Sequence, residues 1–278
     1  MKLAVLADIH GNWVGLQTVV AHLEQWQPDL VIVAGDVVNR GPRPRECLDF
    51  VLGKQKSEGW RLVRGNHEDY VLVFAKPEAP REGPLFEIYR NAAWTYWQLG
   101  GEVTALQAMP FEQSLADPTG AEVRVVHASM QGNRNGIFVS TTDEELRRKI
   151  DPAPGLMCVG HTHWPLIRTI DDTLVVNVGS AGLPFDGDDR VGYAQLTWQQ
   201  GRWQAQIIRL AYDKARNERD FFESGFMAES GPLAPLVLNE LRTARPRLYR
   251  WSVDYEAQVL AEALSAEEAV QRFLAELA

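Results

Sequence analysis

The stretch DLVIVAGD, residues 29–36, joins a run of β-branched residues to a glycine and an aspartate. A short apolar run bounded by turn residues is typical of a buried strand. Similar runs lie on either side of it, KLAVLAD at 2–8 and WRLVRGN at 60–66, and amphipathic segments separate the three. This alternation predicts successive βαβ units, so we expect the first part of the chain to be α/β.

Farther along, residues 85–109 repeat apolar positions at helical spacing and predict a helical insert, with a break at Gly100 and Gly101. From about residue 111, short apolar runs separated by turn signals predict a second, mostly antiparallel sheet. The chain becomes helical after Tyr212, and Ser265 is expected to cap a late helix together with Glu268. We therefore expect one domain over residues 1–212 and a helical C-terminal extension over residues 213–278.

The composition narrows the class of protein. With 278 residues, 45% of them hydrophobic, the chain can build a full core. Its net charge of −9 argues against an extended nucleic-acid surface, which needs clustered Lys and Arg. No apolar segment reaches the roughly 18 residues of a membrane span, and the two cysteines, Cys47 and Cys158, do not suggest a disulfide framework. We expect a cytoplasmic protein without a membrane partner; a homo-oligomer is compatible with the sequence.

Five of the six histidines lie near the ends of predicted strands, in the ordered motifs DIH, GD, GNHE, H and GHTH. Sites in open α/β sheets form at the carboxyl ends of strands, so these motifs predict one shared site. In a triplet such as Asp8-Ile9-His10, the first and third side chains leave the same side of a pleated strand. The same reasoning applies to His161 and His163.

Seven side chains in these motifs are candidate metal ligands: Asp8, His10, Asp36, Asn66, His127, His161 and His163. Seven exceed the needs of one tetrahedral ion and fit two ions that share a carboxylate, for which Asp36 is the natural bridge. Imidazole, carboxylate and amide ligands suit Mn²⁺, Fe²⁺, Ni²⁺ or Zn²⁺, and we expect manganese first. His67 is left without a necessary metal role, so it is a candidate general acid.

The ordered motifs resemble those of the calcineurin-like metallophosphoesterase superfamily over residues 1 to about 212. The stretches GPRPRECL, NVGSAGLPFDGDDRVGYA and LAYD look like its small prokaryotic phosphodiesterase branch. The resemblance implies a four-layer αββα sandwich of two mixed β-sheets flanked by helices. It also implies one metal ion held by Asp8, His10, Asp36 and His163, a second held by Asp36, Asn66, His127 and His161, and His67 as the proton donor.

The expected reaction is hydrolysis of small phosphodiesters, phosphomonoesters or both by a hydroxide that bridges two metal ions, while His67 protonates the leaving group. Two substrate-binding residues are candidates. The side-chain amide of Asn12 could donate to a phosphoryl oxygen, or it could cap the helix that follows. The guanidinium of Arg40 matches the geometry of a phosphate, or it could lie in solvent.

Two other functions compete with this one. The first is a phosphoprotein phosphatase or dinucleoside polyphosphate hydrolase, because GDVVNRGP and RGNHE resemble motifs of that branch. That branch has an aspartate supporting the catalytic histidine where this chain has Asn39. The second is a non-catalytic metal-binding scaffold, since the retromer subunit with this fold serves assembly and lacks the catalytic histidine. Here His67 and every ligand position are filled, which favours an enzyme.

Overall fold

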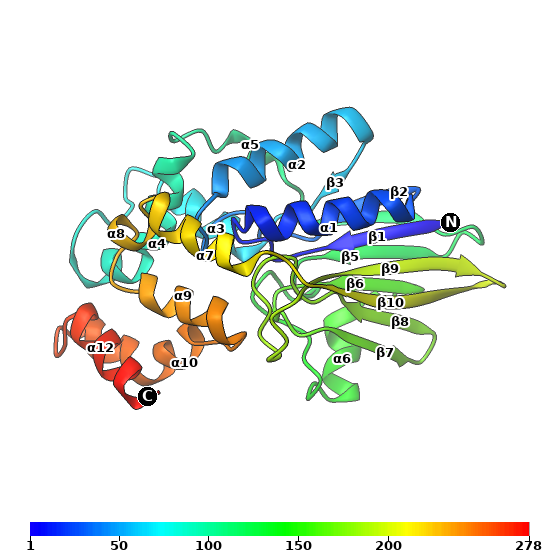
Figure 1. The fold of residues 1–278 in the computed structure, drawn as a ribbon. Coiled ribbons are helices and arrows are strands. Elements are labelled where there is room, and N and C mark those ends of the chain that lie inside the picture. The colour runs from blue at the N-terminus through cyan, green and yellow to red at the C-terminus, as the bar shows by residue number, and fades with distance from the viewer. Residues whose placement is uncertain (278) are drawn as a thin grey trace.

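The computed structural model describes residues 1–277. Two five-stranded sheets pack face to face, helices cover them, and a further group of helices lies beyond one end of the strands (Figure 1). Both sheets contain parallel and antiparallel pairs. The predicted fold class, two mixed β-sheets flanked by helices, is therefore confirmed.

The first sheet has the strand order β10-β9-β1-β2-β3. Its strands are β1 (Lys2–Leu6), β2 (Leu30–Val33), β3 (Arg61–Leu62), β9 (Val191–Gln199) and β10 (Arg202–Leu210). Strands β1, β2 and β3 are parallel, as the βαβ pattern predicts. Strand β9 pairs antiparallel with both β1 and β10, so the last two strands belong to the first sheet rather than to the second.

The second sheet has the order β4-β5-β6-β8-β7. Its strands are β4 (Glu112–Ala116), β5 (Glu122–Val126), β6 (Leu156–Val159), β7 (Leu166–Ile170) and β8 (Thr173–Asn177). The β5–β6 and β6–β8 pairs are parallel, and the two outer pairs are antiparallel. The expectation of a mostly antiparallel sheet is therefore wrong. A crossover helix of 8 residues, α6 (Asp143–Ile150), connects β5 to β6, as a parallel pair requires.

Alternation along β1 shows how the layers are built. Leu3 and Val5 lie in the core between the two sheets, whereas Ala4 and Leu6 lie in the core under the helices. Side chains of a strand point to opposite faces in turn, so one apolar strand serves two cores. The helices of this half are α1 (Trp13–Trp26), α2 (Pro44–Glu58), α3 (Asn66–Val73), α4 (Gly83–Gln98) and α5 (Thr104–Ala108).

Local sequence explains where several helices begin and end. Helix α2 has Pro44 at its first position, and it ends at Gly59 in the left-handed conformation that glycine adopts without strain. The predicted pair of helices over residues 85–109 is confirmed as α4 and α5. Gly100 and Gly101, both with positive φ, lie between them.

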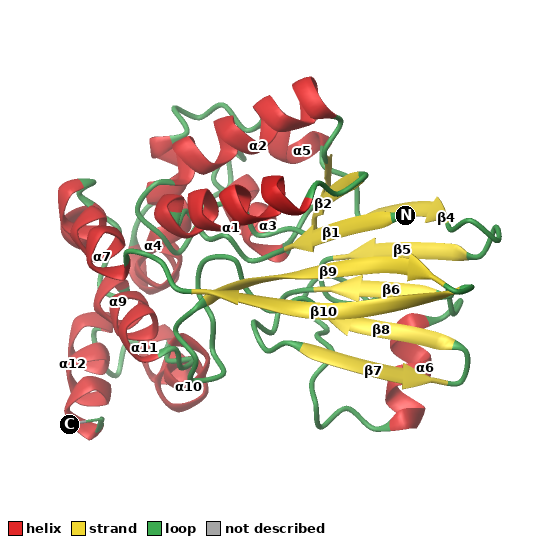
Figure 2. Cartoon of the chain, turned by 45° about the vertical axis from the view of Figure 1, so that its right-hand side comes forward, coloured by secondary structure: helices red, strands yellow, loops and turns green. Residues whose placement is uncertain are grey.

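The C-terminal part of the chain is helical after residue 213. It contains α7 (Lys214–Glu223), α8 (Phe226–Glu229), α9 (Ala234–Thr243), α10 (Leu248–Trp251), a π-helical turn (Ser252–Glu256), α11 (Ala257–Leu260) and α12 (Ala266–Glu276). The predicted cap is confirmed, because the Ser265 hydroxyl accepts from Glu268 N and the Glu268 carboxylate accepts from Ser265 N. These helices gather at one end of both sheets, away from the chain's N-terminus (Figure 2).

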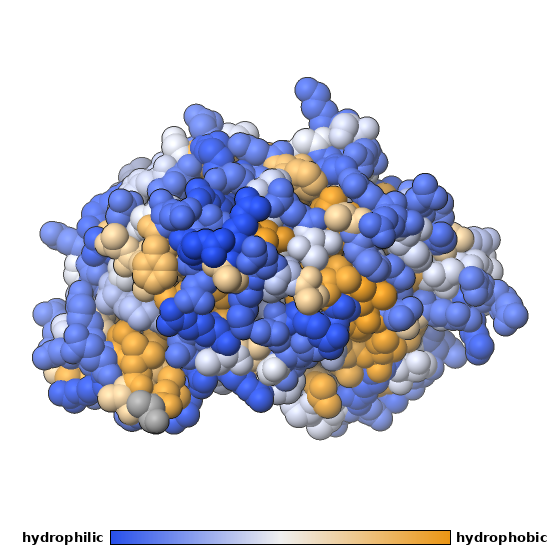
Figure 3. Space-filling view, in the orientation of Figure 1, coloured by the Kyte–Doolittle hydropathy of each residue, from blue (hydrophilic) through white to orange (hydrophobic). Residues whose placement is uncertain are grey.

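The outer surface is mixed in polarity. In the view of Figure 3, hydrophilic side chains cover the region of α7, and hydrophobic ones gather over the sheets around β10. Within residues 1–277, no helix combines the length and the hydropathy needed to cross a membrane. Cys47 and Cys158 are both buried and unpaired, so they act as packing residues.

Candidate metal centre

The seven candidate ligands converge beyond the carboxyl ends of strands from both sheets. Each follows the carboxyl end of a strand: Asp8 and His10 after β1, Asp36 after β2, Asn66 after β3, His127 after β5, and His161 and His163 after β6. Parallel strands end at the same edge, so residues distant in sequence meet there. The structure thus brings together all seven positions.

Most of these side chains are directed toward the site by left-handed backbone turns and not by the alternation of a pleated strand. The φ angles are 57° at Asp8, 49° at His10, 56° at Asp36, 68° at His161 and 58° at His163. Non-glycine residues adopt this conformation at a cost of about 1–2 kcal/mol each. Asp8 and His10 lie close together, but not on one face of a pleated strand, because β1 ends at Leu6 and a turn follows it.

Glycines allow the ligand loops to approach one another. A Cβ on Gly65 would lie 2.1 Å from Asp36 Oδ1, and one on Gly35 would lie 2.7 Å from His127 Nδ1. Gly160 has the same role on the second sheet, where a Cβ would lie 2.6 Å from Asp8 Oδ2. Any larger residue at these three positions would push a candidate ligand out of place.

The first group of ligands comprises Asp8, His10, Asp36 and His163. His10 Nε2 lies 3.1 Å from His163 Nε2 and 3.7 Å from Asp36 Oδ2. Asp8 Oδ1 lies 3.4 Å from His163 Nε2 and 3.9 Å from His10 Nε2. Atoms bound about 2.1 Å from one ion are roughly 3.0–3.4 Å apart, so these separations fit a shared cation after a small contraction.

The second group comprises Asp36, Asn66, His127 and His161. His127 Nε2 lies 3.3 Å from Asp36 Oδ2 and 2.9 Å from Asn66 Oδ1, and His161 Nδ1 lies 2.8 Å from Asn66 Oδ1. Asp36 Oδ2 is therefore near both groups. Its other oxygen, Oδ1, accepts from His67 N at 2.9 Å, which fixes the carboxylate between them.

Hydrogen bonds set the tautomers of three ligand histidines. In each, Nδ1 faces a backbone carbonyl, which can only accept, so Nδ1 carries a proton and Nε2 is the nitrogen left to bind a cation. The carbonyl acceptors belong to Asn39 for His10, Leu183 for His163 and Ala34 for His127. The Nε2 atoms of His10 and His163 face each other, an arrangement that a cation bound to both would stabilise.

Two further observations fit a cation site. Asp8 Oδ1 is fully buried and has no hydrogen-bond partner, whereas buried carboxylate oxygens are normally paired. Burial lowers the pKa of His10 well below its usual value, and burial followed by His127 lowers that of His161 to about 3, so both are neutral ligands. Burial also lowers the pKa of His127, but Asp36 outweighs it and raises the pKa to about 10. The carboxylate thus attracts positive charge to this position.

His67 lies beside the ligands at the start of α3. Its Nε2 is 4.0 Å from Asp36 Oδ2, farther than the other imidazoles near that oxygen, and its Nδ1 is 2.9 Å from Asn39 Nδ2. Asn39 Oδ1 accepts from Arg40 N at 2.9 Å and from Thr95 Oγ1 at 3.4 Å, so the amide NH₂ must face His67. His67 Nδ1 is therefore an acceptor, and Nε2 carries the proton toward the site.

Glu68 supports the site, although sequence reasoning gave it no role. One carboxylate oxygen accepts from Gly65 N at 2.8 Å and Asp36 N at 2.9 Å, and the other accepts from Val37 N at 2.8 Å and Val38 N at 3.3 Å. Burial, followed by Asp36, raises its pKa to about 7. This fully buried residue ties the loop after β2 to the start of α3. A glutamate three residues after Gly65, at the start of a helix, was the available signal.

The two candidate substrate-binding residues differ in their surroundings. Asn12 is 2% exposed; its Oδ1 accepts from Gly15 N at 2.8 Å and its Nδ2 donates to the Gly182 carbonyl at 2.8 Å. These contacts support the helix-cap alternative for Asn12. Arg40 is half-buried, forms no ion pair within residues 1–277, and contributes with burial to lowering the pKa of His67. Its guanidinium therefore lies near the cluster, where its charge also lowers the pKa of the buried Glu240 against the larger, opposite effect of burial.

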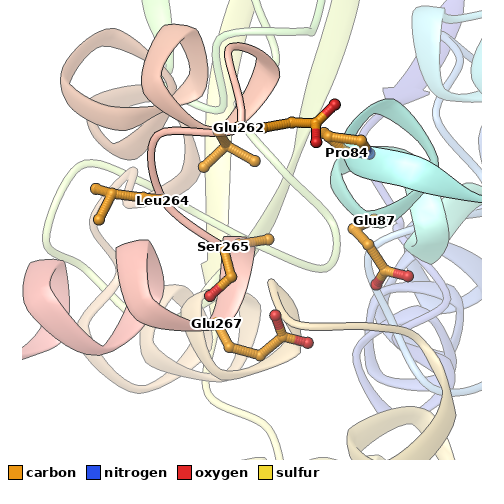
Figure 4. Close-up of a pocket in the computed structure, with 8 residues that line it drawn as sticks. Pro84, Glu87, Glu262, Leu264, Ser265 and Glu267 are labelled. Carbon is orange, nitrogen blue, oxygen red and sulfur yellow. The ribbon is translucent and has the colours of Figure 1, made fainter.

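A separate pocket lies between α4 and α12, with a volume of 320 Å³ (Figure 4). Three glutamates, Glu87, Glu262 and Glu267, line it together with Pro84 and Leu264, and none of the candidate ligands does. Its negative charge would repel a phosphate ester, so the histidine cluster is the better site for such a substrate.

Comparison with known proteins identifies the family. A model of the calcineurin-like phosphoesterase superfamily domain matches residues 1–201. The chain belongs to this superfamily. An uncharacterized protein of Methanocaldococcus jannaschii is 24% identical over 233 residues, which cover 76% of this chain and 88% of the relative. The superfamily predicted from the motifs is therefore confirmed.

Solved structures share the superfamily fold. A metallophosphoesterase from Sphaerobacter thermophilus aligns with a TM-score of 0.67 and 23% identity, over 88% of this chain and 100% of that one. A hypothetical protein from Pyrococcus horikoshii OT3 aligns with a TM-score of 0.72 and 20% identity, over 87% of this chain and 98% of that one. As a calcineurin-like phosphoesterase, the chain is a metal-dependent hydrolase acting on phosphate esters. Among residues 1–277, Asp and His side chains form three groups that could hold a metal ion, and one of these groups includes His67.

Proposed function

We propose that this phosphoesterase hydrolyses small phosphodiesters, phosphomonoesters or both, and that it holds two divalent cations at the centre described above. Asp8, His10, Asp36 and His163 would hold one cation; Asp36, Asn66, His127 and His161 would hold the other. The observation that carries the proposal is the contact of 3.1 Å between the Nε2 atoms of two histidines whose Nδ1 atoms donate to backbone carbonyls. The orphaned Asp8 Oδ1 beside them supports the same conclusion.

The bound cations would supply positive charge to the phosphoryl oxygens and lower the pKa of a water molecule toward neutrality. The protein's own groups do the rest. His67 presents an Nε2–H to the site because Asn39 occupies its Nδ1, so it can donate a hydrogen bond to the oxygen of the departing group. Arg40, which forms no ion pair within the described residues, can bind a phosphoryl oxygen.

The C-terminal helices support the proposed site from outside. Phe185 stacks on the ring of His163 with centroids 4.2 Å apart and an angle of 9°. It also packs against the α7–α9 region, in a cluster that includes Phe221 and Val237. Arg43 at the start of α2 bonds Asp220 of α7 at 2.7 Å. We propose that residues 213–278 extend a catalytic domain at 1–212, in which 85–109 is an insert, and hold the loop around Phe185 against His163.

Asn39 bears on the competing functions. A carboxylate at this position would accept from His67 Nδ1, whereas the Asn39 amide donates to it, so the proton of His67 moves to the site-facing nitrogen. This reversal favours small esters over the phosphoprotein phosphatase and dinucleoside polyphosphate hydrolase alternatives. The non-catalytic scaffold is disfavoured by the same contact, since a scaffold needs no oriented proton on His67.

We also propose that the protein is cytoplasmic and that manganese is its native metal ion.

The test combines metal analysis with activity. Protein loaded with Mn²⁺ should contain two ions per chain by inductively coupled plasma mass spectrometry. It should hydrolyse bis-aryl phosphodiesters or aryl phosphomonoesters in preference to dinucleoside tetraphosphate and phosphopeptide. Two bound ions without turnover of any of these esters would favour the scaffold.

His67→Ala should keep both ions and lose about 10²- to 10⁴-fold in kcat with an alkyl leaving group, and less with a nitrophenyl one. His22→Ala is the matched control, because His22 lies in α1, bonds the Tyr193 hydroxyl at 2.9 Å and is outside the cluster. Full activity of His67→Ala toward an alkyl ester would contradict its role as proton donor.

A further inference from the structure

We propose that Arg134 forms a subsite beside His67 for a second anionic group, a carboxylate or phosphate, carried by the leaving group of the substrate. The inference rests on the proposed function, because His67 marks the leaving-group side of the reaction only if it is the proton donor. It adds a substrate class to that function: esters whose departing alcohol is itself charged.

Contacts from His67 outward define the place. The Tyr70 ring meets the His67 ring edge-on, with centroids 5.1 Å apart and an angle of 90°. The guanidinium carbon of Arg134 lies 4.6 Å from the centroid of the same tyrosine. Tyr89 of α4 backs Tyr70 at 5.6 Å. Arg134 is therefore separated from the proposed proton donor by one aromatic ring.

The loop that carries Arg134 is held from two sides. The Asn133 amide donates to Asp69 Oδ2 at 3.3 Å, which ties the loop to α3. At the other end Gly136 lies against the second metal group, since a Cβ there would be 2.9 Å from His161 Cδ2 and 2.7 Å from Thr162 Cγ2. The loop thus spans the rim from His161 to Tyr70.

The donors of Arg134 are unused. Its side chain is exposed, and within residues 1–277 it forms no ion pair and no hydrogen bond. Its contact with Tyr70 is a cation–π contact that uses none of the N–H groups as hydrogen-bond donors to oxygen, so the five N–H groups of the guanidinium remain available. Such a planar fork matches a carboxylate or phosphate with two parallel hydrogen bonds.

The positive charge of Arg134 and its position over Tyr70 both favour an anionic group as the occupant of the subsite. In a chain of net charge −9, an uncompensated arginine next to the site attracts negative groups locally. An aromatic ring is a poorer occupant, because Arg134 already covers the accessible face of Tyr70 at 4.6 Å. Together with Arg40, Arg134 gives the site two free cations for two anionic groups of one substrate.

The experiment compares two chromogenic phosphodiesters that differ by one charge. Methyl 4-nitrophenyl phosphate and methyl 3-carboxy-4-nitrophenyl phosphate release coloured phenolates from the Mn²⁺-loaded enzyme. We expect the wild type to favour the carboxylated ester in kcat/KM by about five- to tenfold, chiefly through KM, as a partly exposed charge-assisted pair provides. Arg134→Ala should abolish this ratio, and Arg134→Lys should restore part of it.

Arg202→Ala is the control, since Arg202 is also exposed but lies beyond the start of β1, at the opposite end of the sheet from Asp8. It should leave the ratio unchanged. A wild-type ratio that Arg134→Ala does not alter would overturn the subsite while leaving the proposed function intact. If neither of these diesters nor an aryl phosphomonoester is hydrolysed, the proposed function fails. The subsite is then decided by calorimetric binding of the matching benzylphosphonates, whose affinities should differ only when Arg134 is present.

Discussion

Gly65→Ala should disrupt the metal centre although residue 65 is not a ligand. The φ of Gly65 is −98°, an extended conformation that alanine adopts without strain, so the substitution acts through contact alone. The added Cβ would lie 2.1 Å from Asp36 Oδ1 and 2.7 Å from Asp36 N. Because Asp36 N is a backbone atom and Asp36 Oδ1 is held by His67 N, the loop after β2 must move.

The size of the effect follows from what that movement breaks. Overpacking at a buried position costs about 1–3 kcal/mol. Moving Asp36 Oδ1 also weakens its hydrogen bond from His67 N, now 2.9 Å, and a bond to a charged group contributes about 1.5–3 kcal/mol. We expect the free energy of unfolding to fall by about 3–5 kcal/mol. Asp36 Oδ2 would be displaced with its carboxylate, so metal content should fall as well.

Gly53→Ala is the same substitution at a position where the structure predicts a rise in the free energy of unfolding instead of a fall. Gly53 is exposed within α2, and a Cβ there would meet no atom within 4 Å. Alanine in a helix interior is more stable than glycine by about 0.5–1 kcal/mol. Urea unfolding monitored by tryptophan fluorescence, with metal analysis of both variants, tests the pair. If Gly65→Ala unfolds at the wild-type urea concentration and retains its metal, the assignment of Gly65 as a close-contact position fails.

Three other outcomes are expected. Asn12→Ala should cost about 1 kcal/mol of unfolding free energy and leave KM unchanged, because its side chain caps α1; a large rise in KM would restore its role in substrate binding. Asp36→Asn should reduce the metal content to at most one ion per chain, since Asp36 Oδ2 lies within reach of both groups; two retained ions would contradict the shared carboxylate. Chelation should lower the melting temperature, and added Mn²⁺ at about 100 times its Kd should restore roughly 2.7 kcal/mol; calorimetry with no shift would contradict binding at this cluster.

The sequence predicted the position of the site more reliably than its internal geometry. The strands before Asp8 and Asp36 have continuous apolar runs, and their parallel pairing follows from the helices between them. Once the strands are parallel, the polar residues after them must meet. This argument needs only the order of elements along the chain, which local composition determines.

Features that depend on contacts between distant segments left no such pattern. Glu68 bonds backbone N–H groups at Val37 and Val38, about thirty residues away, and any buried glutamate in a helix would look the same in sequence. The orientation of Asn39 depends on Thr95 in α4. The residues of β9 and β10 would suit a strand in either sheet. The pairing of β9 with β1, which places both strands in the first sheet, could therefore not be inferred from their own residues.

Backbone strain links metal binding to folding in this protein. Five of the seven candidate ligands occupy left-handed conformations, and at about 1–2 kcal/mol each their combined cost is comparable to the net stability of a domain, about 5–15 kcal/mol. Asp and His tolerate this region better than branched residues do, which places the cost toward the lower limit. Cations bound only in the folded state offset it by mass action. Glu68 stabilises the left-handed turn at Asp36 without a cation, because it accepts from three backbone N–H groups of that loop and from Gly65 N. Substituting Glu68 should therefore weaken metal binding even though Glu68 is not itself a candidate ligand.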